Sequence, residues 1–338
     1  MPSRAKSRCR GDEETRAAAG LVGRRRQPPR APKRAEAQEH ALLLLRRGRH
    51  RCGHGRPRTR RPPSPCRAGA RFGKPPRVPP TFSVQATDGP ARAGRITTAH
   101  GAVQTPAFMP VGTRAAVTGL TAQELRELGA EMILGNTYHL ALRPGPEAMR
   151  QLGGLHRFMG WDRGILTDSG GFQIFSLARD RVVNEAGARF RSYIDGREHM
   201  LTPESSIAMQ EALGSDVMMV LDVCPPSTAP EAEIEAAMHR THRWALRSLA
   251  ARQSGEQALF AIVQGGLSPT WRAQSAEFLG RHAFDGFAIG GVAVGDTRSQ
   301  RGEVIAAAAE RLPHDRPRYL MGVGTPPDML LAIARGVD

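Results

Sequence analysis

Five short clusters of polar residues and glycines carry groups that could do chemistry, and each follows an apolar run. The first cluster combines a carboxylate, two glycines and an aromatic ring: Asp168, Ser169, Gly170, Gly171 and Phe172. Glycines let a flat ligand approach the backbone closely, and a phenylalanine ring can stack on such a ligand. An aspartate that caps the next helix is the commoner reason for an isolated Asp-Ser-Gly-Gly run. This cluster alone therefore leaves both interpretations open.

The next two clusters add a second carboxylate and an amide. Asp222 ends an apolar run, and a buried carboxylate must face a cavity or find a partner. Gln264 offers a donor and acceptors at one edge, which suits a heterocycle, although a glutamine that bonds a loop backbone is an equal alternative. Cys224 has no histidine placed to activate it, so it is interpreted as packing rather than as a nucleophile.

The last two clusters add glycines and a methionine. Gly291 lies in a glycine-rich run whose backbone N–H groups suit an oxygen or an anion, although such glycines can serve only to turn a strand. Met321 could cover a flat base, or fill the core as methionines more often do. The stretch that follows could hold a phosphate through backbone amides. It consists of Gly322, Val323, Gly324, Thr325, Pro326, Pro327 and Asp328.

Together these groups would form a slot for a guanine-like base. The N1–H and the exocyclic amine of guanine would donate to the carboxylates of Asp168 and Asp222, and its carbonyl oxygen would accept a backbone N–H. Its two faces would pack against Phe172 and Met321. This interpretation requires that residues far apart in the sequence meet at one place.

The elements that must bring these residues together are short apolar runs that alternate with helical patterns. The apolar runs lie at residues 132–134, 164–167, 217–221, 259–263, 286–289 and 319–323, and the helical patterns at 122–128, 203–213, 231–251 and 270–280. Such alternation predicts βαβ units and a parallel sheet, preceded by antiparallel hairpins within residues 82–111. Because the polar clusters directly follow the runs, the pattern favours an α/β fold of the (β/α)8 TIM-type barrel class. No Gly-x-Gly-x-x-Gly turn supports a doubly wound dinucleotide-binding sheet.

The basic charge of the chain is confined to its first 80 residues. The formal net charge is +16 over 338 residues, but residues 1–80 hold 23 Lys and Arg against 5 Asp and Glu. Residues 81–338 hold 25 against 27, which indicates a nearly neutral globular domain. The Arg- and Pro-rich leader, with 12 of the 26 prolines, is predicted to be disordered. An RNA-binding arm, a transit peptide and a misplaced start codon, with initiation near Val78, all stay open for it.

The composition also bears on membrane association, cellular location and metal binding. No apolar run approaches the ~18 residues of a membrane-spanning helix. Cys224 is the one cysteine outside the leader, so a reducing, cytoplasmic location is expected. No metal site is predicted. His239 and His242 are spaced like two ligands, but a third is not apparent, and a solvated helix face is the simpler interpretation.

From about Phe82 to Asp338 the chain resembles the bacterial tRNA-guanine transglycosylases, also called queuine tRNA-ribosyltransferases. The segments that carry the resemblance, in order and at consistent spacing, are residues 135–140, 167–173, 221–225, 263–266, 290–295 and 319–324. The resemblance implies a (β/α)8 barrel that exchanges the wobble guanine of tRNA anticodons for the 7-deazaguanine base preQ1, in queuosine biosynthesis. The exchange would pass through a covalent ribosyl-enzyme intermediate, and the target base must leave its stack to react.

The same resemblance assigns roles to individual residues. Asp168 is implied to be the general acid/base. The residues implied to bind the substrate are Asp168, Ser169, Gly170, Gly171, Phe172, Asp222, Gln264, Gly291 and Met321. Residues 322–328 are implied to contact RNA. A homodimer and a structural zinc ion are implied as well.

The sequence departs from the family pattern at several points. Phe172 and Val223 stand where many bacterial members have Tyr and Glu. The family's nucleophile, an aspartate in a Phe-Asp-Cys context, falls three residues beyond the position of Asp338, which itself matches a preceding Gly-Val-Asp turn. The zinc ligands, a Cys-x-Cys-x-x-Cys run and a histidine, fall further on, as does the last barrel strand. We therefore expect a truncated barrel with open sheet edges that is inactive as residues 1–338.

Two other functions stay open. A non-catalytic accessory subunit of the same family would bind tRNA without reacting, although the intact run that begins at Asp168 argues against it. A barrel enzyme that acts on free purines or nucleotides is kept open by the near-neutral charge of residues 81–338. An archaeal-type enzyme that modifies another tRNA position is disfavoured by Cys224 and Val294.

Overall fold

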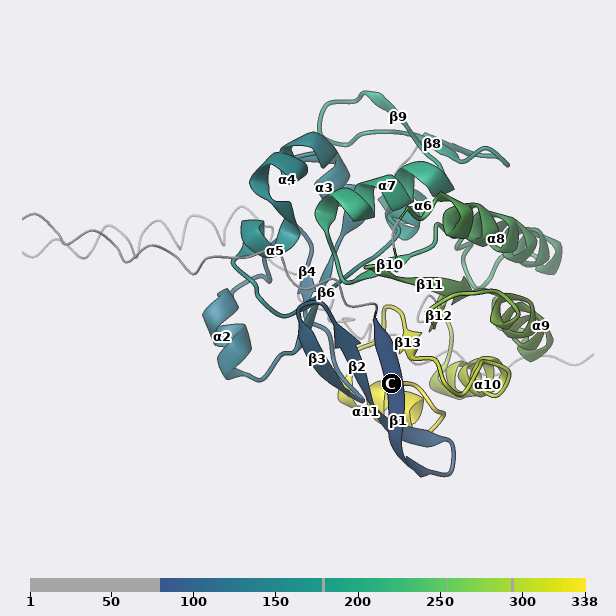
Figure 1. The fold of residues 1–338 in the computed structure, drawn as a ribbon. Helices are drawn as coiled ribbons and strands as arrows, with labels where there is room; N and C mark the ends of the chain where they lie inside the picture. The colour runs from purple at the N-terminus through teal and green to yellow at the C-terminus, as the bar shows by residue number, and fades with distance from the viewer. Residues whose placement is uncertain (1–79, 178–179, 254, 293–294) are drawn as a thin grey trace, which may run out of the picture. The chain divides into compact units, whose positions relative to one another are not determined.

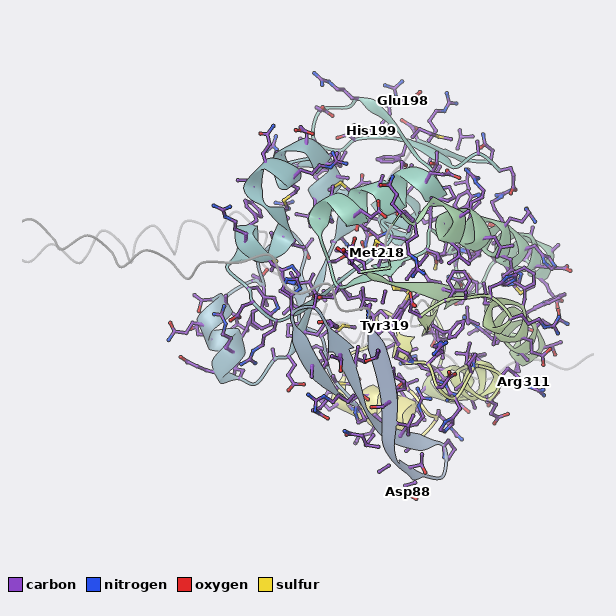
Figure 2. The ribbon with its side chains drawn as sticks, viewed as in Figure 1. Asp88, Glu198, His199, Met218, Arg311 and Tyr319 are labelled. Atoms are coloured by element: carbon purple, nitrogen blue, oxygen red, sulfur yellow. The ribbon has the colours of Figure 1, made fainter. Side chains whose placement is uncertain are left out.

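The computed structural model describes residues 80–177, 180–253, 255–292 and 295–338 (Figure 1). The predicted disordered leader, residues 1–80, thus lies outside the described residues except for Pro80. No helix in the described part of the chain is both long enough and apolar enough to cross a membrane. Figure 2 shows Met218 and Tyr319 inside the domain, whereas Asp88, Glu198 and Arg311 lie at its periphery.

An antiparallel three-stranded sheet opens the domain, as the hairpin prediction for residues 82–111 required. Its strands are β1 (Thr81–Asp88), β2 (Ala91–Thr98) and β3 (Gly101–Thr105), in the order β1-β2-β3. The β1–β2 turn contains Gly89 with φ of +55°, a conformation that favours glycine. Val103 of β3 belongs to the same buried cluster as Val217 and Phe260, so this sheet packs against the amino-terminal end of the strands described next.

The central element is a parallel sheet of seven strands. They are β4 (Val111–Gly112), β5 (Met132–Gly135), β6 (Gly164–Thr167), β10 (Val217–Met219), β11 (Ala258–Val263), β12 (Gly286–Ile289) and β13 (Arg318–Leu320), in the spatial order β13-β12-β11-β10-β6-β5-β4. Every residue of β5, β6, β10, β11 and β12 is buried, which explains why these strands are continuous apolar runs.

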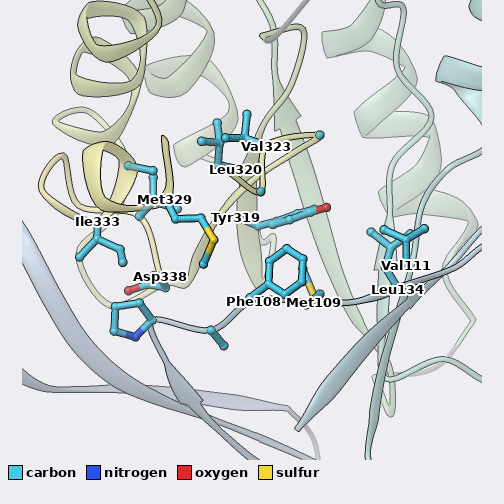
Figure 3. Close-up of a pocket in the computed structure, with 16 residues that line it drawn as sticks. Phe108, Met109, Val111, Leu134, Tyr319, Leu320, Val323, Met329, Ile333 and Asp338 are labelled. Atoms are coloured by element: carbon cyan, nitrogen blue, oxygen red, sulfur yellow. The ribbon is translucent and has the colours of Figure 1, made fainter. Parts of the chain in front are cut away.

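The sheet curls into a half-barrel (Figure 1). Within the described residues β4 and β13 are its two edge strands, and both line one apolar pocket of about 340 Å³. Figure 3 shows Val111 and Leu134 on one side of this pocket and Tyr319 and Leu320 on the other. The predicted parallel α/β fold is confirmed, with the curvature of a TIM-type barrel.

Helices cover the outside of the curled sheet. They are α2 (Ala122–Glu127), α3 (Thr137–Leu142), α4 (Pro146–Leu152), α5 (Gly154–Met159), α6 (Gly171–Leu177), α7 (Pro203–Leu213), α8 (Glu231–Ala251), α9 (Pro269–Gly280), α10 (Arg298–Ala309) and α11 (Pro326–Ile333). The predicted start of α7 is confirmed, because Thr202 caps it and Pro203 occupies its first turn. Helices α7, α8, α9 and α10 contact one another in sequence along the sheet (Figure 1).

A second antiparallel sheet, which the sequence did not predict, lies between α6 and α7. Its strands are β7 (Arg181–Val183), β8 (Ala188–Arg191) and β9 (Glu198–Leu201), in the order β7-β8-β9. Phe190 and Ala188 of this sheet pack with Leu221 and Ile174. The sheet therefore lies near the residues that follow β6 and β10.

Candidate active site

Six neighbouring strands of the parallel sheet carry polar or flexible residues at their carboxyl ends. In the order of the sheet, from β5 to β13, these residues are Asn136, Asp168, Asp222, Gln264, Gly291 and Met321. Parallel strands of a curled sheet end on one edge, so the groups that follow them converge on a common mouth. The structure thus brings together the clusters that the sequence spreads over nearly 200 residues.

The carboxylate of Asp168 accepts hydrogen bonds from the residues that follow β5, the strand beside β6. The backbone N–H of Thr137 donates to its Oδ1 at 2.8 Å, and Nδ2 of Asn136 donates to its Oδ2 at 2.7 Å. Burial raises the pKa of Asp168 to about 7, and the nearby carboxyl of Asp222 adds to the rise, while hydrogen bonds from the backbone of Thr137 and Gly170 oppose it. Asp168 can therefore gain or lose a proton near neutral pH, as an acid/base group must.

Asn136 and Thr137 were not among the predicted site residues. Both directly follow β5, and this is the same signal that pointed to Asp168 after β6. The hydroxyl of Thr137 also donates to the carbonyl oxygen of Asp168 at 2.5 Å. These two residues fix the backbone and the carboxylate of Asp168 together.

Asp222 follows β10, the strand beside β6, and accepts hydrogen bonds from neutral donors. Nε2 of Gln264 donates to its Oδ2 at 2.8 Å, and Oγ of Ser169 donates to its Oδ1 at 3.3 Å. Burial raises the pKa of Asp222 to about 6, and the bonds from Gln264 and Ser169 limit the rise. Asp168 and Asp222 thus form a buried pair of carboxyl groups, both easier to protonate than ordinary aspartates.

Glycines allow the first two clusters to touch. A Cβ on Gly171 would lie 2.9 Å from the carbonyl oxygen of Asp222 and 3.1 Å from its Oδ1. Gly170 has φ of +83°, a left-handed conformation that side chains disfavour. The Asp-Ser-Gly-Gly run therefore needs both glycines to reach Asp222.

Gly291 and Cys224 lie against the amide of Gln264. A Cβ on Gly291 would lie 2.5 Å from Oε1 of Gln264, and the backbone N–H of Gly291 donates to the thiol of Cys224. Burial raises the pKa of Cys224 to about 12, so the thiol stays protonated and agrees with the packing interpretation. The neighbouring Val223 is buried in an apolar cluster that includes Tyr138.

The two apolar groups predicted to cover a base follow different strands of the sheet, β6 and β13. Phe172, in the first turn of α6, is 46% exposed, and Met321, after β13, is half-buried against the core. Each keeps apolar surface available to a ligand. Their function as a sandwich stays a prediction.

The predicted RNA-contact stretch forms the loop into α11. Gly322, Gly324 and residues 325–327 are exposed, whereas Asp328 is buried. The carboxylate of Asp328 accepts bonds from Arg298, Arg301 and Thr325, which ties α11 to α10. The loop also lines the apolar pocket in Figure 3 beside Tyr319. Burial and the nearby carboxyl of Asp168 raise the pKa of Tyr319, which puts this pocket next to the polar mouth.

One cluster in the described residues has donors that suit a metal ion: His100, His156 and Asp216. Its polar atoms already have partners. Nδ1 of His100 lies 2.8 Å from Oδ1 of Asp216, and Nε2 of His156 lies 3.1 Å from both Oδ2 of Asp216 and the carbonyl oxygen of Arg163. A nitrogen that faces two acceptors is a donor, so this geometry is a hydrogen-bonded network that joins the β2–β3 turn to the amino-terminal end of β10.

The zinc ion that the family resemblance implies does not fit the described residues. A Cys-rich site needs several thiolates, and Cys224 is a single protonated thiol within the mouth. The interpretation of His242 as part of a solvated helix face is wrong. Its ring is buried, its Nε2 lies 2.9 Å from Oγ of Ser275, and it stacks on Phe278 because α8 packs against α9.

Comparison with known proteins identifies the family. Residues 87–338 match the family described as queuine tRNA-ribosyltransferase. Similar curated proteins of that name include those of Solidesulfovibrio magneticus, 52% identical over 77% of this chain and 70% of the relative, and Dehalococcoides mccartyi, 53% identical over 73% and 63%. The protein of that name from Thermus thermophilus is 51% identical over 76% of this chain and 67% of its own length. The chain thus spans about two thirds of the length of these relatives. By the extent of these matches, this chain belongs to the queuine tRNA-ribosyltransferase family.

Proposed function

We propose that the mouth of the half-barrel binds a guanine-type base and that the protein exchanges the wobble guanine of tRNA for the 7-deazaguanine base preQ1. The observation that carries this proposal is the buried pair of Asp168 and Asp222, each on a neighbouring strand and each with a raised pKa. The names of the relatives support the reaction class.

Base recognition follows from the donors and acceptors at the mouth. Guanine presents N1–H and an exocyclic amine, which match the carboxylates of Asp168 and Asp222. Its carbonyl oxygen matches the backbone N–H of Gly291, which in the free protein donates to a weak acceptor, the thiol of Cys224. Bound guanine would therefore replace the weak hydrogen bond from Gly291 to the Cys224 thiol, and the contacts that the two carboxylates make in the free protein, with stronger hydrogen bonds.

Asp168 has the protonation behaviour that base exchange needs. In the first step a carboxylate attacks C1′ of the ribose, the bond from C1′ to N9 of guanine breaks, and Asp168 gives its proton to the departing base. In the second step the incoming base attacks C1′, the carboxylate leaves, and Asp168 takes the proton that the incoming base loses. Two displacements retain the configuration at C1′.

Neither described carboxyl group of the pair suits the nucleophilic role. In this proposal both carboxyl groups contact the base, and Asp168 also carries the transferred proton, so neither is placed to attack C1′. We assign the attack to the aspartate that the family resemblance puts in the Phe-Asp-Cys segment after the position of Asp338. The other proposed partners are a second copy of the chain and a structural zinc ion bound outside the described residues.

Calorimetric titration of residues 1–338 with guanine tests the base site without requiring catalysis. We expect binding that Asp168→Asn and Asp222→Asn each weaken at least tenfold, whereas Asp162→Asn, at an exposed surface carboxylate, leaves it unchanged. Incorporation of labelled guanine into tRNA tests the reaction, and we expect it only when the chain includes the Phe-Asp-Cys segment. Undiminished guanine binding by Asp222→Asn would contradict the proposed site.

A barrel enzyme that acts on free purines is the second candidate. The near-neutral charge of residues 81–338 favours it, because RNA-binding domains are usually basic. Filter binding of tRNA at two salt concentrations separates the two functions, since phosphate contacts make affinity fall steeply with salt. Guanine binding without any affinity for tRNA at low salt would favour the second candidate.

A further inference from the structure

Arg272 is a fully buried cation directly behind the base site. It lies in α9, and none of its surface is exposed. Its Nε donates to the carbonyl oxygen of Gly266 at 2.9 Å, and its Nη1 donates to those of Val263 at 2.8 Å and Gly290 at 2.6 Å. Its Nη2 lies 3.4 Å from the carbonyl oxygen of Gly291.

These four carbonyl groups belong to two loops that form the base site. Val263 ends β11 and Gly266 follows Gln264 in the next loop, and Gly290 and Gly291 follow β12. A planar guanidinium that donates hydrogen bonds to both segments fixes the distance between them and their relative orientation. The guanidinium hydrogen bonds described above all run to backbone carbonyl oxygens, so the function of Arg272 depends on the path of the backbone rather than on one side chain.

The orientation of one peptide bond links Arg272 to the ligand. The carbonyl group of Gly290 and the N–H of Gly291 belong to the same trans peptide and point in opposite directions. Because Arg272 holds the carbonyl oxygen of Gly290, the N–H of Gly291 points away from α9, toward Cys224 in the mouth. Gly291 has φ of +65°, a conformation that needs such support.

We propose that Arg272 is a positioning residue that aims the backbone N–H of Gly291 at the carbonyl oxygen on C6 of the bound purine. It thereby selects 6-oxopurines over purines that lack this oxygen. This inference rests on the proposed function, because it deepens the description of the same base site. Arg272 itself does not touch the base.

Lysine cannot replace Arg272 in this function. Its ammonium group is a single point of charge and cannot reach four carbonyl oxygens that surround a planar fork. Burial lowers the pKa of Arg272 to about 10, so the guanidinium remains charged at neutral pH. Arg272→Lys therefore keeps a cation behind the site and changes mainly the geometry of the two loops.

The test compares two bases with two variants. Guanine and 2-aminopurine share the amino group at C2, but 2-aminopurine has neither the oxygen at C6 nor the N1–H. The test therefore compares how much each substitution changes the affinity for each base, not the two affinities themselves. The matched control is Arg318→Lys. Arg318 is also buried and also donates to backbone carbonyl oxygens, those of Gly336 and Leu312, but it lies at the start of β13, away from the mouth. Affinities are measured by calorimetry, and unfolding midpoints are recorded for every protein.

We expect Arg272→Lys to weaken guanine binding about tenfold, the usual effect of losing one well-placed hydrogen bond, and to change 2-aminopurine binding less than twofold. We expect Arg318→Lys to leave both affinities unchanged. An equal loss for both bases, or no loss for either, would overturn the proposal. If the unsubstituted protein binds no guanine, the proposed function fails and the inference fails with it.

A second variant covers the case in which Arg272→Lys does not fold. Arg272→Gln places no charge in the interior and keeps a planar group with two N–H donors. Its guanine affinity should fall at least tenfold relative to 2-aminopurine. If neither variant folds while Arg318→Lys does, Arg272 is a folding residue and the proposed selectivity role is wrong.

Discussion

Replacing Asn136 by serine changes the protonation of Asp168 without removing a charged group. Nδ2 of Asn136 donates to Oδ2 of Asp168 at 2.7 Å, and its Oδ1 accepts the N–H of His139 as the cap of α3. Serine is as good an N-cap as asparagine, so the helix keeps its cap. Its shorter side chain cannot reach the carboxylate, so Asp168 loses one donor.

The expected shift follows from the strength of that bond. A hydrogen bond to a charged group is worth about 1.5–3 kcal/mol, and 1.36 kcal/mol corresponds to one pH unit. Losing the donor disfavours the ionised form, so the pKa of Asp168 should rise from about 7 by roughly one to two pH units. The hydrogen bond from the N–H of Thr137 to Oδ1 of Asp168, 2.8 Å long, is retained in the variant and limits the rise in the pKa of Asp168.

Guanine affinity measured by calorimetry from pH 5.5 to 8.5 tests this expectation. The ionised carboxylate accepts the base's donors, so wild-type affinity should rise with pH and level off above pH 7. In Asn136→Ser the levelling should move toward higher pH, and affinity at pH 7 should fall about tenfold. Asn184→Ser, in the exposed β7–β8 turn, is the control and should follow the wild type. A loss of affinity that is the same at every pH would refute the reasoning.

Two further predictions concern stability, and their signs are opposite. The pKa of Asp168 is raised from 3.8 to about 7, so its contribution to stability is present below pH 3.8 and is lost as pH rises to 7. The unfolding free energy of the wild type should therefore fall relative to Asp168→Asn by up to about 4 kcal/mol between pH 4 and pH 8, as measured by urea unfolding. The pKa of Asp216 is lowered, so its contribution is present above pH 3.8 and is lost in acid. Asp216→Asn should cost about 3 kcal/mol at pH 7 and progressively less as pH falls well below 3, and an equal cost at pH 7 and at pH 1.5 would contradict the assignment.

The positions of the predicted site residues follow from a local rule that the sequence alone supplies. Asp168 and Gln264 come directly after buried apolar strands, and the carboxyl ends of parallel strands meet. Asn136 also directly follows a buried strand, so the same rule could have identified it as a site residue. The apolar runs also identified the strands of the parallel sheet from β5 onward, because strands buried on both faces need apolar residues throughout.

The residues that the sequence missed depend on contacts between distant segments. His100 is 116 positions from Asp216, and the carbonyl of Gly290 is 18 positions from Arg272. No local pattern marks an arginine as buried when its partners are backbone oxygens. The β7–β9 sheet was missed for another reason. Its strands have three or four residues, which is too short for a clear alternation of polar and apolar positions.

Two buried aspartates at opposite ends of the half-barrel have pKa values shifted in opposite directions. Asp216, at the amino-terminal end of β10, is as buried as Asp222, which follows the same strand. Burial alone would raise the pKa of both. Asp216 receives bonds from two histidines and from the N–H of Ile165, and these lower its pKa. Asp222 receives bonds from neutral donors alone within the described residues, and its pKa stays raised. The donors that Asp222 and Asp168 lack are those that a bound base would bring.

This difference predicts that guanine binding releases protons. The N1–H and the amino group of guanine would stabilise the ionised carboxylates, as the histidines stabilise Asp216, and so lower the pKa values of Asp168 and Asp222. At pH 6.5, groups with pKa values of about 7 and 6 together hold about one proton, which binding should expel. Calorimetry in two buffers of different ionisation enthalpy measures that number, and Asp168→Asn should reduce it to about a quarter of a proton. Binding with no proton release at pH 6.5 would mean that the N1–H and the amino group of the base do not donate to these carboxylates.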